Sequence, residues 1–229
     1  MEHFLDLQKT KIFSSCTEFE CRAMMHCFKA RFKTFLKNEK VILQGDPMED
    51  VVLVVKGEAM VQHIDTMGNI TIISELERGD MYGLEGAFAG VENYKDTLIA
   101  TQKTLVLFLN KHRIITPCSN RCIKHEKVIR HIMEIVAESH IKLKEKLTHM
   151  SKKTTRDKLL SYFNAVSKKA ESEYFEIPFN KTELANYLSV DRSAMTTELS
   201  KMKDDGIIDF DKNQYRLIDK KSGKNRGRK

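Results

Sequence analysis

The chain has 229 residues, of which 41% are hydrophobic and 31% charged, with a formal net charge of +7. This length allows two modest domains, each with its own core. No apolar run approaches the roughly 20 residues that span a membrane, and the opening MEHFLDLQKTK lacks a secretory signal. These features argue against a membrane-spanning or exported protein and predict a cytoplasmic one.

Three of the five cysteines, Cys16, Cys21 and Cys27, fall in a predicted amino-terminal helix. They lie beside apolar residues such as Phe13 and Met24, where a thiol packs as a small hydrophobic group. Their spacing also loosely matches an iron-sulfur ligand set, which is the alternative interpretation. An odd cysteine count without an export signal argues against a disulfide framework.

Residues 40–110 contain seven of the ten glycines, between Gly45 and Gly90. Short apolar runs alternate there with turn sequences, at residues 40–43, 51–55, 59–64, 70–74, 97–100 and 104–109. Such short runs predict an antiparallel β-barrel or β-roll rather than a parallel sheet. The glycines suit turns with positive φ, and their spacing matches neither a Walker nor a dinucleotide motif.

The sequence PCSNRCIKH places Cys118 and Cys122 four residues apart at the start of the next predicted helix, with His125 one turn later. Thiols at a helix amino terminus can be stabilised as thiolates, which suits a metal site or a redox switch. A structural role is the alternative. The sequence gives no certain cofactor and no other metal site.

A long helix is predicted from about Arg121 to Met150. Its apolar or small residues recur at spacings of three and four, namely Ile129, Ile132, Val136, Ser139, Leu143 and Met150, with Leu147 beside them. A stripe this narrow is typical of a two-stranded helical dimer. Packing against its own domain is the alternative interpretation. A further helix is predicted at about residues 155–169.

The stretch NKTELANYLSVDRSAMTTEL, residues 180–199, has the pattern of a helix-turn-helix. Thr182 is the predicted cap of its first helix, and the second helix is predicted to start near Arg192. Apolar Met195, Leu199 and Met202 recur on one side of the second helix, and Ser193, Thr196, Thr197 and Ser200 on the other. An ordinary amphipathic helix pair is the alternative interpretation.

The residues after this pair predict a wing. Gly206 ends the second helix, and two short strands, within residues 207–210 and 214–218, are joined by the turn 211–213. Residues 152–229 carry 18 Lys and Arg against 12 Asp and Glu, which is a net +6 of the total +7. Such a surplus suits phosphate binding. The basic tail from Lys220 is predicted to be disordered and either touches DNA or aids solubility.

The order of these parts resembles the Crp/Fnr family of bacterial transcription regulators. The segments QGDP, VVKGEAMV and LERGDMYG match the family's cyclic-nucleotide-binding-type roll. The resemblance implies an α+β fold with an amino-terminal antiparallel β-roll (double-stranded β-helix), a long dimerisation helix and a carboxy-terminal winged helix-turn-helix. The implied parts are residues 1–120, 121–150 and 151–219, followed by the tail at 220–229.

The resemblance also implies a homodimer that binds a palindromic site in double-stranded DNA and works with RNA polymerase. A signal at the roll would change DNA affinity through a hinge near residues 148–153. Gly-x-Ser-x-Gly, His-Glu-x-x-His and Gly-Lys-Ser/Thr patterns are absent from the sequence, so an enzyme is not expected. A ligand-binding module without DNA reading is the alternative of another class. It would leave the wing and the basic final third unexplained.

The predicted DNA-binding residues are Lys181, Thr182, Arg192, Ser193, Thr196, Thr197, Ser200 and Lys212. By the resemblance, Arg192 occupies a position that contacts phosphate or a base. Thr197 stands where family members often carry a guanine-reading arginine, so a family operator cannot be transferred to this chain. Lys181, Thr182 and Lys212 are predicted phosphate contacts that fix register without reading sequence.

The predicted effector pocket comprises Gly83, Leu84, Glu85, Tyr94 and Lys95. By the resemblance, Leu84 replaces a ribose-binding carboxylate and Tyr94 replaces a phosphate-binding arginine, and neither replacement keeps that polar chemistry. Glu85 and Lys95 lie one position away from the expected sites. An unknown small-molecule effector other than cAMP is therefore predicted. A metal or thiol sensor at Cys118 and Cys122, or regulation without a ligand, are the alternatives.

Overall fold

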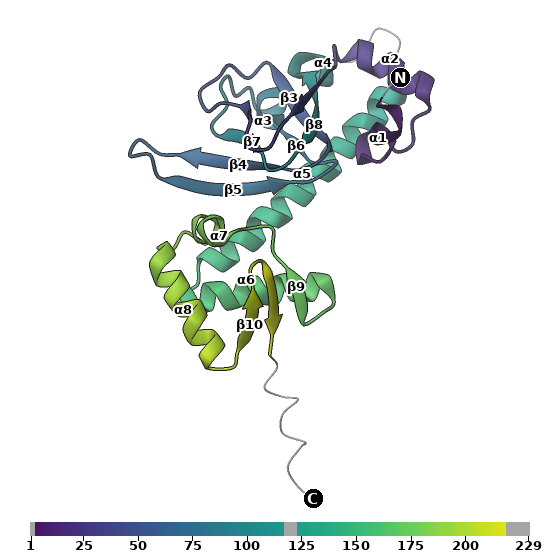
Figure 1. Ribbon diagram of the computed structural model, residues 1–229. Helices are drawn as coiled ribbons and strands as arrows, with labels where there is room; N and C mark the ends of the chain where they lie inside the picture. The colour runs from purple at the N-terminus through teal and green to yellow at the C-terminus, as the bar shows by residue number, and fades with distance from the viewer. Residues whose placement is uncertain (1–2, 117–122, 219–229) are drawn as a thin grey trace, which may run out of the picture. The chain divides into compact units, whose positions relative to one another are not determined.

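The computed structural model describes residues 3–116 and 123–218. Its internal contacts divide the chain into two units, residues 1–140 and residues 141–229. The boundary falls inside the long helix α5 (Ile123–Met150), which is drawn in teal in Figure 1. This helix confirms the predicted one from Ile123 onward, and the predicted start at Arg121 lies outside the described residues.

The first unit combines short helices with two antiparallel sheets. Its helical segments are α1 (Phe4–Gln8), the 3-10 helix η1 (Lys11–Phe13), α2 (Glu18–Cys27), α3 (Leu84–Phe88) and α4 (Lys111–Ile115). Its strands are β1 (Arg31–Phe35), β2 (Lys40–Ile42), β3 (Asp50–Lys56), β4 (Ala59–Ile64), β5 (Ile70–Leu76), β6 (Met81–Tyr82), β7 (Thr97–Ala100) and β8 (Thr104–Asn110). The two sheets have the orders β1-β8-β3-β6 and β2-β7-β4-β5. The predicted antiparallel roll is confirmed, and β1 and β6 were not predicted.

Strand β3 is buried on both faces, which explains its uninterrupted apolar run. Successive side chains of a strand point to opposite faces. Val51, Leu53 and Val55 pack in a cluster that includes residues of α2 and α5, whereas Val52 and Val54 pack in the cluster between the two sheets. One face of the strand therefore packs in the cluster that includes residues of α2 and α5, which we call the helical cover. The other face packs in the interior of the roll.

Gly57, in the turn from β3 to β4, has backbone atoms where a side chain would have to lie. Its φ is +88°, and a Cβ there would lie 2.6 Å from the Lys103 carbonyl oxygen. Because both the backbone conformation and the close approach exclude a side chain, this turn requires glycine. The neighbouring Thr104 hydroxyl donates a 2.7 Å hydrogen bond to the Glu58 carbonyl.

The apolar residues of α5 divide into two sets. Val128, Ile132 and Ile135 are at most 2% exposed and pack inside the first unit. Of the predicted stripe, Ile132 therefore packs against its own domain, as the alternative interpretation expected. Large apolar side chains elsewhere on the helix remain exposed: Met133, Val136, Ile141, Leu143 and Leu147. The helix thus has a buried side in the first unit and exposed apolar residues along its length in both units.

The second unit contains the helix-turn-helix and its wing. Its elements are α6 (Thr155–Ala170), β9 (Tyr174–Glu176), α7 (Lys181–Leu188), α8 (Arg192–Asp204), β10 (Ile208–Asp211) and β11 (Gln214–Leu217). The strands form one antiparallel sheet in the order β10-β11-β9. Within the unit, β10 lies beside α8, and β9 and β11 contact α6 (Figure 1). The winged helix-turn-helix is confirmed, and β9 was not predicted.

Candidate DNA-recognition surface and effector region

Helix α7 begins with a capping box. The Asn180 side-chain oxygen accepts from the backbone N–H groups of Thr182 (2.9 Å) and Glu183 (3.0 Å), and Glu183 accepts from the Asn180 N–H at 2.7 Å. The prediction that Thr182 caps this helix was wrong, because Asn180 reaches the free N–H groups first. Thr182 is instead an exposed residue of the first turn.

The turn between α7 and α8 is held from both sides. Ser189 ends α7 in the left-handed conformation with φ 50°, and the Lys158 ammonium of α6 donates to the Leu188 and Ser189 carbonyls at 3.3 and 3.4 Å. Asp191 then caps α8 by accepting from the Ala194 N–H at 2.7 Å. Hydrogen bonds from Ser193 and from the Ala194 backbone lower the pKa of Asp191.

Helix α8 has one buried side and one exposed side, as predicted. Met195, Leu199 and Met202 are fully buried, so the helix is fixed to the unit by its apolar side. The predicted DNA-facing residues Arg192, Ser193, Thr197 and Ser200 are exposed, and Thr196 is half-buried. The two sides follow from the 3.6-residue period of the helix.

Three hydroxyl groups on α8 already donate within the helix or its cap. Ser193 Oγ donates to Asp191 Oδ1 at 2.5 Å, Thr196 Oγ1 to the Arg192 carbonyl at 2.8 Å, and Ser200 Oγ to the Thr196 carbonyl at 3.2 Å. The hydroxyl oxygens can still accept hydrogen bonds, but their protons are already donated to these partners.

Arg156, at the start of α6, joins α6 to α8. Its guanidinium contacts Glu198 through Nε and Asp205 through Nη1, the latter at 2.9 Å. These two hydrogen-bonded carboxylates raise the pKa of Arg156. An open groove lies between α6 and α8, lined by Thr154, Thr155, Arg156, Ser193, Ala194, Thr197, Glu198 and Lys201. The contact between Arg156 and Glu198 was not predicted, because the two residues are 42 positions apart in the sequence.

Two predicted phosphate-binding lysines lie at the wing. Lys212 is exposed in the tight turn between β10 and β11, where its φ is 53°. Lys181, from α7, places its ammonium 5.2 Å from the centre of the Phe210 ring on β10. Lys203 of α8 lies over the same ring at 5.1 Å and pairs with Asp209 at 2.7 Å. The wing is thus tied to both helices by cations on one aromatic ring.

The last turns of α5 enter the core of the second unit. His149 accepts from or donates to Ser161 Oγ at 2.8 Å and packs edge-on against Tyr162. Lys146 is 6% exposed and lies 4.8 Å from the centre of the Tyr187 ring on α7. Burial lowers the pKa of His149 and lowers the pKa of Lys146 to about 8. The carboxyl end of α5 is therefore packed against α6 and α7 of the helix-turn-helix.

In the predicted effector region, Tyr94 is a core residue. It is 3% exposed, its hydroxyl donates to the Asp50 carbonyl at 2.5 Å, and its ring stacks on Tyr82 with centroids 5.8 Å apart. Gly83, with φ +90°, packs so closely that a Cβ would lie 3.2 Å from the Tyr94 ring. Burial raises the pKa of both tyrosines.

The other three predicted effector residues are dispersed around this pair. Leu84 packs against the hydrophobic cluster of the helical cover. Glu85 is half-buried in helix α3, and burial followed by the charge of Asp96 raises its pKa. Lys95 is exposed in the loop before β7. The structure thus brings Gly83 and Tyr94 together, while Leu84 belongs to the core and Lys95 faces solvent.

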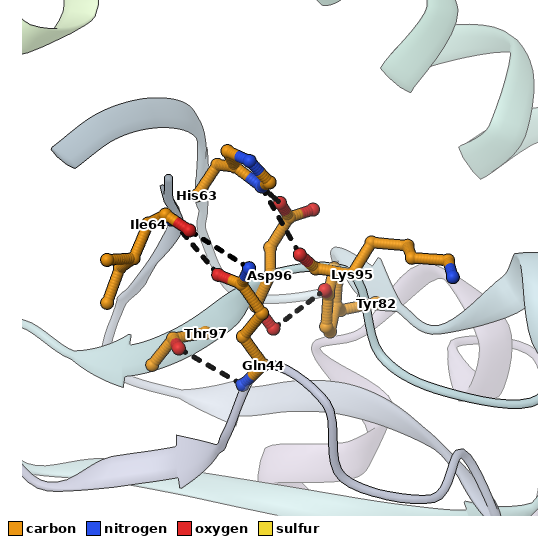
Figure 2. A network of polar contacts seen from close by, with 7 residues as sticks. All are labelled: Gln44, His63, Ile64, Tyr82, Lys95, Asp96 and Thr97. Carbon is orange, nitrogen blue, oxygen red and sulfur yellow. Dashed lines mark hydrogen bonds and ion pairs between the residues drawn. The ribbon is translucent and has the colours of Figure 1, made fainter. Parts of the chain in front are cut away.

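A polar network beside this region was not predicted (Figure 2). His63 Nδ1 lies 3.0 Å from Asp96 Oδ1 and 3.3 Å from the Lys95 carbonyl, so this nitrogen is the donor. Tyr82 donates to the Asp96 carbonyl at 3.2 Å. Gln44 makes two 3.0 Å hydrogen bonds with the backbone of Ile64. The network ties β4 to the loop that carries Tyr94.

The amino-terminal thiols are largely buried. Cys16 and Cys21 are 7% and 0% exposed, in agreement with the predicted packing role, although Cys16 precedes α2 rather than lying in a helix. Burial, followed by the neighbouring Cys16, raises the pKa of Cys21 to about 12. Cys118 and Cys122 lie outside the described residues. Within the described part of the chain, no cluster of three or more His, Cys, Asp or Glu side chains is arranged to hold a metal ion.

Two family models match the chain in the order of its two units. Residues 32–120 match the cyclic nucleotide-binding domain, and residues 157–222 match the Crp-like helix-turn-helix domain. Among the helices of residues 3–116 and 123–218, none is long and apolar enough to span a membrane.

Named relatives share this arrangement. The transcriptional activator protein FnrL of Cereibacter sphaeroides is 22% identical over 196 residues, covering 82% of this chain and 76% of FnrL. The structure of FixK2 from Bradyrhizobium japonicum has a TM-score of 0.64 at 18% identity and covers 84% of this chain and 94% of that chain. The c-di-GMP-responsive regulator CLP of Xanthomonas campestris has a TM-score of 0.73 at 13% identity, covering 86% and 98%.

The roll, the long helix and the winged helix-turn-helix with its exposed α8 define a DNA-binding transcription regulator. The chain belongs to the Crp/Fnr family, as the cyclic nucleotide-binding match and the Crp-like helix-turn-helix match together show.

Proposed function

We propose that this regulator binds a palindromic site in double-stranded DNA as a homodimer and acts on transcription together with RNA polymerase. The observation that carries the proposal is α8, which is fixed by its buried side and capped by Asp191 while it exposes a continuous polar side. An α-helix presented in this way fits the major groove of B-form DNA. Lys181, Thr182, Arg192 and Lys212 would contact phosphates, and Ser193, Thr196, Thr197 and Ser200 would face the bases.

The exposed apolar residues of α5 support the homodimer. Met133, Val136, Leu143 and Leu147 are 59%, 41%, 43% and 65% exposed and fall at the a and d positions of one heptad pattern. His140 occupies the a position between Val136 and Leu143 in that pattern. An exposed apolar seam of this period is typical of a two-stranded helical interface. This seam replaces Ile132 and Ser139 of the predicted stripe with Met133 and His140.

Sedimentation of the purified full chain tests the interface. We expect a dimer at micromolar concentration and a monomer when Leu147→Glu places a charge in the seam. Ile115→Glu, at an exposed apolar residue of α4, is the matched control and should leave the dimer intact. A wild-type chain that binds DNA specifically while remaining monomeric would contradict the homodimer and leave the DNA-binding function standing.

We also propose that the signal is a small molecule other than cAMP, sensed at the roll near Tyr82 and Tyr94. Tyr94 is buried and hydrogen-bonded at the position where the family pattern places a phosphate-binding arginine. The half-buried Glu85 and the His63–Asp96 pair supply polar chemistry of a different kind. A ligand that stabilises the DNA-competent form must bind that form more tightly than the other.

Thermal unfolding tests this part of the proposal. A ligand at 100 times its Kd stabilises the folded state by about 2.7 kcal/mol. We expect 1 mM cAMP to leave Tm unchanged, whereas one member of a metabolite panel raises Tm and changes DNA affinity. A rise in Tm with cAMP would overturn the exclusion of cAMP.

Selection from a random double-stranded DNA pool tests the DNA-binding proposal directly. We expect enrichment of a two-fold symmetric motif whose half-sites are about one DNA turn, roughly 34 Å, apart. Enrichment of a single half-site would contradict the palindrome, and enrichment of no sequence at all would contradict specific DNA reading by this chain.

A further inference from the structure

The side of α8 that would face the DNA major groove has few hydroxyl groups free to donate hydrogen bonds to bases. The hydroxyl protons of Ser193, Thr196 and Ser200 are donated to Asp191 and to backbone carbonyls of the helix. Reading a guanine or adenine acceptor with any of these groups would require breaking the internal hydrogen bond first. Such an exchange replaces one hydrogen bond by another, so it adds little net affinity.

The stretch of α8 between Arg192 and Lys201 also lacks the side chains that read bases with two hydrogen bonds. From Ser193 to Ser200 the sequence is SAMTTELS, which contains no Arg, Lys, Asn or Gln. Bidentate contacts to guanine and adenine depend on these residue types. Glu198 could accept from cytosine, but its carboxylate is paired with the Arg156 guanidinium.

This part of α8 exposes methyl groups, which can contact bases without a hydrogen bond. Ala194 and Thr197 are both exposed, lie one helical turn apart, and line the groove between α6 and α8. Thr197 is diametrically opposite the buried Met195, Leu199 and Met202 on the helix, because residues advance by 100° each. The thymine methyl is the apolar group that a base presents in the major groove, and Ala and Thr methyls contact it.

We propose that Thr197 and Ala194 are specificity-determining residues that recognise thymine methyl groups in each half-site. The proposal rests on the DNA-binding function proposed above and specifies its base preference. Removal of one buried methyl-sized group changes affinity by about four-fold, which corresponds to about 0.8 kcal/mol. The selected half-sites should therefore contain thymines whose value to the protein lies in their methyl group rather than in their hydrogen-bonding edge.

The test replaces thymine by uracil in the selected site, one position at a time, and measures binding of the full chain by fluorescence anisotropy. Uracil lacks only the methyl group, so base pairing is kept. We expect about four-fold weaker binding at one or two thymines of each half-site. Equal affinity for the thymine and uracil sites, with specific binding retained, overturns the proposal and leaves DNA reading intact.

Two variants assign the effect to Thr197. Thr197→Val keeps the methyl and removes the hydroxyl, so discrimination between thymine and uracil should persist. Thr197→Ser keeps the hydroxyl and removes the methyl, so discrimination at one thymine should disappear. The opposite result, loss with Val and retention with Ser, would assign recognition to the hydroxyl and overturn the proposal. Absence of any selected sequence would overturn it together with the DNA-binding function.

Discussion

The exposed side of α8 and the roll interior around Tyr94 use polar groups in opposite ways. On α8, the hydroxyl groups of Ser193, Thr196 and Ser200 lie at the surface and donate locally, over four residues or fewer. In the roll, Tyr94 is buried and bonds to Asp50, which is 44 positions away in sequence. The hydrogen bonds on α8 form within the helix and its cap. The hydrogen bond of Tyr94 forms only when distant parts of the chain have folded into the roll.

Because of this difference, substitutions in the two regions should affect different properties of the protein. Substitutions on the exposed side of α8 remove few packed atoms, so they should alter DNA binding without unfolding the unit. Substitutions at Tyr94 or Tyr82 remove buried rings and should first affect stability. An effector that bound in the roll would therefore have to displace packed side chains. The side of α8 that would contact DNA is already exposed.

Tyr94→Ala should give the largest effect. Truncation of a buried aromatic ring costs about 3–5 kcal/mol of unfolding free energy, because a cavity replaces the ring. Tyr94→Phe should cost about 1–3 kcal/mol, since it leaves the Asp50 carbonyl without this donor. Urea unfolding measures both values. Equal stability of Tyr94→Ala and wild type would show that the ring is not a core element.

Lys146→Met tests a buried polar group inside the recognition unit itself. The pKa of Lys146 is lowered by burial from 10.5 to about 8. Wild-type stability should therefore rise from pH 8 to 10.5, because the unfolded chain binds more protons there, by roughly 3 kcal/mol at 1.36 kcal/mol per pKa unit. Lys146→Met should lack this rise.

The measurement is urea unfolding of wild type and Lys146→Met at pH 8 and pH 10. Lys142→Met, at an exposed position one turn earlier on α5, is the matched control and should follow wild type. Parallel pH profiles of wild type and Lys146→Met would contradict the buried environment of the ammonium.

Arg192→Ala should weaken DNA binding by about ten-fold and leave stability within about 0.5 kcal/mol of wild type. The residue is exposed at the start of α8, so its loss removes a charge without opening the core. If Arg192 contacts phosphate, the slope of log K against log salt should fall by about 1, and the loss should be uniform across sequences. Lys169→Ala, at an exposed position in the last turn of α6, is the control for charge alone.

The smallest expected effect distinguishes the real cap of α7 from the predicted one. Asn180→Ala should lower the unfolding free energy by about 1 kcal/mol, because two backbone N–H groups lose their acceptor. Thr182→Ala should change it by less than about 0.5 kcal/mol. Thermal or urea unfolding of the two variants gives the comparison, and a larger loss with Thr182→Ala would restore Thr182 as the cap.

Features carried by local periodicity could be predicted from the sequence. The buried side of α8 repeats every three to four residues, and β3 is a continuous apolar run, so both were identified. Strands β1 and β9 were missed because they are short and mostly exposed, with a single buried residue each. Their pairing partners, β8 and β11, supply the stability that the local sequence lacks.

Long-range polar contacts could not be predicted in the same way. His63 and Asp96 lie 33 positions apart, and Arg156 and Glu198 lie 42 apart, so nothing in either local pattern connects them. The replacement of a polar position by Tyr94 was visible in the sequence. Its burial was not, because a tyrosine can either fill a core or line a pocket.

The strand order of the first unit also determines when its strands can pair while the chain is being synthesised. β1 pairs with β8 through Arg31 and Phe108, and β2 pairs with β7 through Lys40 and Ile99. A nascent chain therefore holds its first strands without their partners until residues near 110 have left the ribosome. Because long-range pairing is slow and exposes strand edges, this interval is when the chain is most open to aggregation or to chaperones.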